Sequence, residues 1–195
     1  MKSAFVFCAA LIAVVFLQGC QTGARSIGVQ PGVTTDGLQM SLVLVPSSAA
    51  HDPEFEIAIR NVGETDVCLN LGYMLANGKR MFPQNINLVL IDKTGKTWTL
   101  SVGIVHIAGR VDDYMVPLRV GSAYSIRLRL GQLVSPKTGE FQIKLPRDGC
   151  AITAEFAGIS ADRVNRDMEG MRLMNFWNGR LRSNTIRISR AEMVQ

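Results

Sequence analysis

The side chains that could carry out chemistry in this 195-residue sequence, two histidines and sixteen carboxylates among them, show no clustering. The two histidines, His51 and His106, lie far apart in sequence, and neither has a metal-ligand spacing with a cysteine. Asp112 and Asp113 are consecutive carboxylates that we expect in a loop; on an extended chain they would point to opposite faces and could not easily share a proton. The sequence has no GxSxG, HExxH or phosphate-loop motif. These observations predict no catalytic residue, no metal site and no cofactor.

An apolar segment near the N-terminus ends abruptly at a cysteine. Lys2 is the only charged residue before position 20, and residues 4–17 form an apolar run of about fourteen positions. A membrane-spanning helix needs roughly 20 such residues. A charged start followed by roughly 7–15 apolar residues is typical of a secretory signal. The alternative, a buried core helix, fits poorly because the run is apolar on every side.

The residues LQGC at 17–20 resemble the lipobox of bacterial lipoproteins, in which an aliphatic residue and a small residue precede a cysteine. The resemblance implies that residues 1–19 are removed and that Cys20 is acylated on its thiol and its new amino group, with fatty acids such as palmitate. Two or more acyl chains anchor a protein stably. We therefore expect a lipid-anchored protein of the bacterial cell envelope that faces the periplasm. If the sorting rules of enterobacterial lipoproteins apply, the resemblance implies the outer over the inner membrane, because Gln21 stands in place of an aspartate.

Two further cysteines remain after Cys8 leaves with the signal and Cys20 takes lipid. Cys68 and Cys150 are an even pair in an oxidising compartment, which predicts a disulfide bond. A bond that closes so long a loop would contribute about 4–5 kcal/mol in the chain-entropy model. The alternative is two buried free thiols.

The rest of the chain divides into a tether and one domain. Residues 20–37 lack an apolar period and are rich in Gly, Thr and Gln, which predicts a flexible tether behind the lipid. Residues 38–195 then form one domain of ordinary length. The whole sequence carries a mildly basic net charge of +5.

From position 38 onward, apolar and polar residues alternate in short runs, which predicts strands with one buried and one exposed face. The runs are 38–45, 54–61, 67–71, 86–92, 97–100, 124–130, 140–145, 150–156 and 184–189. We expect an all-β, antiparallel immunoglobulin-like β-sandwich of about eight or nine strands, because two one-faced sheets must bury those faces against each other. The helical spacing of Val164, Met168 and Met171 within residues 159–174 predicts one long, partly helical loop before the last strand.

Three segments resemble bacterial envelope proteins with immunoglobulin-like folds. The segment MNFWNGRLRSNTIRIS resembles their C-terminal strand pair, with a Trp-x-Gly turn at Trp177 and Gly179 and a Ser-Asn step at Ser183 and Asn184. RNVGETDVCLNLG and VPLRVGSAYSIRLRL resemble two of their turns. The resemblance implies a fold and a compartment, and it brings no catalytic residue.

Trp177 and Gly179 have structural interpretations of their own. We expect Trp177 to fill the edge of the core with its indole N–H bonded to one acceptor. The alternative is a stacking platform for a sugar or a peptide. We expect Gly179 to supply a positive φ in the turn.

Arginines gather near the C-terminus, among them Arg180, Arg182 and Arg187. They could bind anionic lipid head groups, lipopolysaccharide or the acidic cell wall. Alternatively, they are outward-facing strand residues that keep sheet edges soluble, as Arg127 and Arg129 would be on another strand. Nucleic acid is not an expected partner, because interleaved exposed aromatic residues are lacking and the protein is exported.

The sequence predicts a non-enzymatic binding or structural module of the envelope. The first alternative is a protease inhibitor, or an accessory subunit of an envelope complex, that presents a loop such as 103–114 or 159–175 to its partner. The second alternative is a hydrolase with a carboxylate site.

Overall fold

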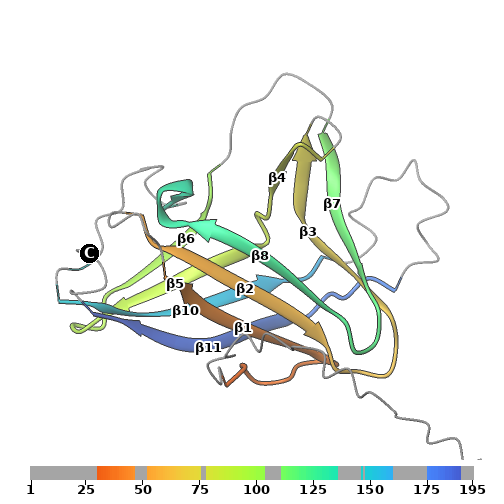
Figure 1. Cartoon of the computed structure of the whole chain (residues 1–195), viewed down its shortest axis with the longest axis horizontal. Helices are drawn as coiled ribbons and strands as arrows, with labels where there is room; N and C mark the ends of the chain where they lie inside the picture. Colours follow the sequence, from red (N-terminus) through yellow and green to blue (C-terminus); the bar gives the residue numbers. More distant parts are fainter. Residues whose placement is uncertain are drawn as a thin grey trace, which may run out of the picture.

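The computed structural model describes residues 30–46, 52–75, 78–103, 111–135, 146, 148–159 and 175–189. The regular secondary structure of this part of the chain is strands and one short 3-10 helix, which turns and loops connect (Figure 1). The elements are β1 (Leu38–Val45), β2 (Glu54–Asn61), β3 (Val67–Leu75), β4 (Arg80–Phe82), β5 (Ile86–Asp92), β6 (Thr97–Val102), β7 (Val111–Leu118), β8 (Ala123–Arg129), η1 (Leu130–Gln132), β9 (Leu133–Val134), β10 (Cys150–Ala157) and β11 (Arg180–Ile188). Across these described ranges, no helix has the length and apolar character to cross a membrane.

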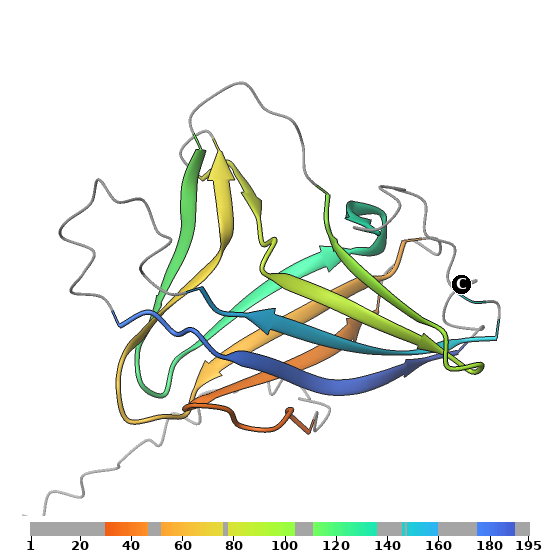
Figure 2. The same ribbon diagram turned by 180° about the vertical axis from the view of Figure 1, so that it is seen from behind.

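The strands form three antiparallel sheets. Their orders are β1-β2-β8, β11-β10-β5-β6-β9 and β4-β3-β7. Figures 1 and 2 show the first two sheets as stacked layers whose strands cross at an angle, while β3, β4 and β7 stand upright at one end. Turns connect β2 to β3 and β7 to β8, and the start of β3 bridges through Cys68 to Phe176, just before β11. The predicted antiparallel all-β class is confirmed.

One hydrophobic core lies between the layers, and the alternation in the sequence explains it. Successive side chains of a strand point to opposite faces, so every second residue of β1 and β2 enters the core. Leu38, Met40, Leu42 and Phe55 are fully buried, and Phe156 of β10 meets them from the other layer. Burying one such side chain stabilises the fold by about 1.5–3 kcal/mol. The bounds of β1 and β2 agree with the predicted runs.

The main difference from the expected strands is β7. The sequence reasoning placed Asp112 and Asp113 in a loop, whereas they lie within this strand, opposite Met74 and Tyr73 of β3. Two acids and a proline disfavour a strand by propensity. They are tolerated here because β7 is an edge strand, where Pro117 leaves no ladder hydrogen bond unmade. The expected strand at 140–145 lies outside the described residues, and so does the expected partly helical loop at 159–174 beyond its first residue.

A β-bulge in β11 ties the two layers together along one side. Thr153 of β10 pairs with Thr185, but Glu155 pairs with Arg182, so Ser183 and Asn184 together oppose a single residue. The Ser183 hydroxyl accepts the N–H of Ala154 at 2.8 Å. The Asn184 side chain is directed instead toward β1, the edge strand of the other layer. The predicted Ser-Asn step is therefore a link between sheets.

Candidate functional site

An opening lies on the side opposite that link, beside β8, which is the edge strand of its sheet in the part of the chain that the structure describes. It is a hollow of about 510 Å³. Its walls come from β8, from β4 and the start of the next turn, from the end of β6 and from η1. The lining is mostly apolar and includes Met81, Phe82, Val102, Ile126 and Leu128. Met81 keeps 52% of its surface exposed.

Two tyrosines form one corner of the hollow. The hydroxyl groups of Tyr114 on β7 and Tyr124 on β8 lie 2.5 Å apart and share a hydrogen bond, and their rings meet edge to face. Burial, followed by the hydrogen bond with Tyr124, raises the pKa of Tyr114 well above its ordinary value. This pair fixes β7 against β8, so the upright sheet and the first layer hold the hollow between them.

The charged group in the lining is Arg127, and its charge is partly balanced. Its Nε donates to Glu56 Oε2 at 2.9 Å, and the next arginine, Arg129, pairs with Glu54 at 3.4 Å. Both arginines remain more than half exposed, so each pair adds little stability. These are the outward-facing positions predicted for this strand.

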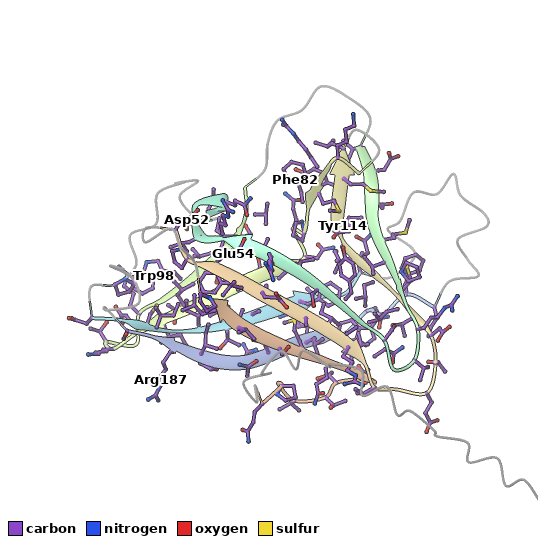
Figure 3. The ribbon with its side chains drawn as sticks, viewed as in Figure 1. Asp52, Glu54, Phe82, Trp98, Tyr114 and Arg187 are labelled. Atoms are coloured by element: carbon purple, nitrogen blue, oxygen red, sulfur yellow. The ribbon has the colours of Figure 1, made fainter. Side chains whose placement is uncertain are left out.

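The three C-terminal arginines do not form one patch. Arg180, Arg182 and Arg187 are all exposed on β11, as expected of outward-facing residues. Arg182 is paired with Glu155. Arg187 borders a second, smaller hollow whose lining includes Asp92 and Asp148. Arg180 and Arg187 lie opposite the two ends of β10, and Figure 3 shows Arg187 pointing away from the molecule on the side opposite Phe82 and Tyr114.

The predicted disulfide bond is wrong. Cys68 and Cys150 are free, buried thiols. Cys150 pairs with Ile188 at one end of β11, whereas the carbonyl of Cys68 accepts the N–H of Trp177 beyond the other end. The length of β11, about 26 Å at 3.3 Å per residue, lies between them. A disulfide requires Cα atoms within about 7 Å. Burial raises the pKa of both thiols.

Trp177 occupies the core position expected of it. The indole is 5% exposed, stacks on Phe156 and donates its N–H to the carbonyl of Asp36 at 3.2 Å. The stacking-platform alternative is wrong, because the ring faces the interior. Gly179 differs from expectation, since it is not among the glycines with positive φ. A Cβ at this position would lie 2.6 Å from Trp177 Cζ2, so glycine is required by close approach to the indole.

Other predicted residues do not gather into a site. Cys20, His51 and His106 lie outside the described residues. Asp112 and Asp113 are neighbours on β7, and burial followed by the charge of Asp112 raises the pKa of Asp113. Within the described ranges, no three His, Cys, Asp or Glu side chains lie together as metal ligands. The hollow itself was missed because residues far apart in sequence form it, and no local pattern marks the place where two sheet edges diverge.

No family model matches the sequence, and no curated protein matches it. Among solved structures, an X-ray structure of the Northeast Structural Genomics Consortium target SoR45 matches with 11% sequence identity and a TM-score of 0.35. The match covers 84% of this chain and 94% of that one.

Proposed function

We propose that the protein is a lipid-anchored lipoprotein of the bacterial envelope whose β domain is a non-enzymatic binding module, with the hollow beside β8 as its binding surface. The observation that carries the binding role is a contrast between the two sides of the stacked sheets. Asn184 joins β1 to β11 on one side, whereas β8 diverges from β4 and β6 on the other. Concave, mostly apolar surfaces with a few polar groups are typical of binding sites.

We further propose that the two stacked layers are an immunoglobulin-like sandwich. The antiparallel pairing and the shared core support this assignment. The turn residues named in the sequence also support it. Asn61 is buried and closes its Asn-x-Gly turn by accepting the N–H of Gly63 at 3.0 Å, while its amide donates to the carbonyl of Leu118.

The anchor rests on the apolar run and on Cys20, and substitution of this cysteine tests it. Cys20→Ala should move the protein from the membrane fraction to the soluble periplasmic fraction and abolish labelling by a palmitate analogue. Cys8→Ala is the matched control, because that residue lies in the segment to be removed, and it should change neither readout. A Cys20→Ala protein that stays in the membrane fraction would contradict the proposal.

Site-specific photo-crosslinking in intact, producing cells tests the binding surface. A photoreactive residue in place of Met81, at the wall of the hollow, should capture a defined product. The same residue in place of Thr185, on the exposed face of β11, should not capture it. Identical products from both positions, or none from Met81, would contradict binding in the hollow.

A further inference from the structure

The hollow runs along the edge of β8 and not over one of its faces. Five consecutive residues, from Tyr124 to Leu128, line it. Alternate side chains of a strand point to opposite faces, so a cavity over one face would be lined by every second residue. An unbroken run of lining residues places the cavity beside the backbone. This edge extends for about 14 Å at 3.4 Å per residue.

The ladder with β2 determines which backbone groups of β8 face the hollow. Leu130 donates its N–H to the carbonyl of Pro53, and the N–H of Asn61 bonds to the carbonyl of Ser122, so even-numbered residues of β8 bond to β2. Hydrogen-bonded pairs alternate with non-bonded pairs in an antiparallel ladder. The N–H and C=O groups of Ser125 and Arg127 therefore point away from β2. Among the described residues, no strand pairs with them.

A side chain marks the end of this open edge. The N–H of Arg129, the next odd-numbered residue, donates to the side-chain oxygen of Gln132 at 3.0 Å. Gln132 thus supplies the acceptor that a neighbouring strand would supply. The bond confirms the direction deduced for the odd-numbered residues, and it leaves Ser125 and Arg127 as the central open pair.

We propose that the ligand of the hollow is an extended peptide segment of another protein, which adds to β8 as a further strand. This proposal rests on the binding function proposed above and specifies its ligand class. Backbone groups at Ser125 and Arg127 supply the hydrogen bonds of such strand addition. Side chains of the added strand lie beside those of β8 on the same faces. The segment should therefore present apolar residues beside Tyr124, Ile126 and Leu128, and an acidic residue beside Arg127.

Charge favours a different protein over a second copy of this chain as the source of the strand. If two copies paired through β8, Arg127 and Arg129 of one copy would lie among the arginines of the other. Like charges on facing strands are destabilising. Glu56 and Glu54 on β2 offset these charges only in part, because both arginines remain more than half exposed. A segment with a glutamate or aspartate beside Arg127 would instead be attracted to β8.

A proline substitution separates backbone bonding from side-chain contact. Ser125→Pro removes an N–H that points away from β2, so the ladder with β2 is kept, whereas Ser125→Ala keeps the N–H and removes the hydroxyl. The probe is a fluorescent, capped peptide, Val-Glu-Val-Thr-Val, whose glutamate and threonine match Arg127 and Ser125. Fluorescence anisotropy with the full-length protein in detergent measures the affinity. Ser125→Ala should change Kd by less than about twofold, and Ser125→Pro should weaken binding about tenfold.

Methylated peptides repeat the test without altering the protein, and so do not depend on how well Ser125→Pro folds. N-methylation of the threonine and the glutamate blocks the edge that would face β8 and should weaken binding about tenfold. N-methylation of the central valine alters the opposite edge and should leave the affinity within about twofold. Equal binding of the two methylated peptides would overturn strand addition and leave the hollow as a side-chain pocket.

Two other outcomes would also overturn the peptide assignment. One is that no peptide binds at millimolar concentration while Met81 still captures a non-peptide product; in that case the binding function stands. The other is self-association that Ser125→Pro abolishes and the peptide does not inhibit, which would identify a second copy as the occupant. If Met81 captures nothing and no peptide binds, both the peptide assignment and the proposed function fail.

Discussion

The side-chain amide of Asn184 bonds to both backbone groups of Leu42, accepting its N–H at 2.8 Å and donating to its carbonyl at 3.0 Å. Leu42 lies on the edge strand of one layer and Asn184 in the bulge on the edge strand of the other. One side chain therefore supplies the two backbone hydrogen bonds that a neighbouring strand would make with Leu42. The bulge gives up regular pairing at one position of β11 and closes one side of the stacked sheets.

Asn184→Ala should lower the free energy of unfolding by about 1–3 kcal/mol, because both polar groups of Leu42 lose their partner in a part-buried place. Urea unfolding followed by circular dichroism measures the change. Asn178→Ala is the matched control, since Asn178 is exposed just before β11. Its effect should stay within about 0.5 kcal/mol. Equal effects of the two substitutions would show that the amide link does not stabilise the sheets.

Gly179→Ala should destabilise the fold by about 1–3 kcal/mol, because the added methyl group overlaps the indole of Trp177. The effect should shrink when Trp177→Phe is present, since the smaller ring leaves room for the methyl group. A double-mutant cycle of unfolding free energies measures this coupling. If Gly179→Ala destabilises the Trp177→Phe protein as much as the wild type, contact with the indole is not the reason for glycine, and the backbone conformation is.

Tyr114→Phe should make the protein less sensitive to alkaline pH. The folded-state pKa of Tyr114 is raised, so above the unfolded value of about 10 the folded state keeps a proton that the unfolded state releases. Stability is then lost as pH rises beyond that value. Unfolding free energies at pH 8 and pH 11 should differ less for Tyr114→Phe than for the wild type. An unchanged difference would exclude Tyr114 as the titrating group.

Cys68 and Cys150 should react with an alkylating reagent only after unfolding, and without any reductant. Both thiols are buried, and their raised pKa values reduce the thiolate that reacts. Alkylation in buffer and in 8 M urea, followed by peptide mass mapping, follows each cysteine separately. A linked Cys68–Cys150 peptide, or protection that persists in urea until reductant is added, would restore the disulfide.

The sequence predicts well those parts of the fold that local alternation controls. The alternation of Phe55, Ile57 and Ile59 with polar residues predicts β2 with its bounds and its buried face. It fails where a neighbour overrides local preference, as in β7, whose Asp112 and Pro117 are acceptable only because the strand is an edge.

Long-range contacts explain the remaining errors. The even number of remaining cysteines and the expected compartment predicted a disulfide, but the path of the chain separates Cys68 from Cys150 by the length of a strand. A glycine after a tryptophan suggested a positive φ, but the contact with the indole explains Gly179. The hollow forms where β8 and β4 diverge. Neither segment has a sequence pattern that shows where two strands separate, so the hollow could not be predicted.

The partners in the Asn184–Leu42 link are 142 residues apart in sequence, which bears on the order in which the protein matures. Because synthesis begins at the N-terminus, β1 is made early and the bulge of β11 late. Until then the outer edge of β1 lacks this amide, and an unpaired strand edge is prone to wrong association. The protection of this edge is therefore complete only when β11 has been made and its Asn184 reaches β1.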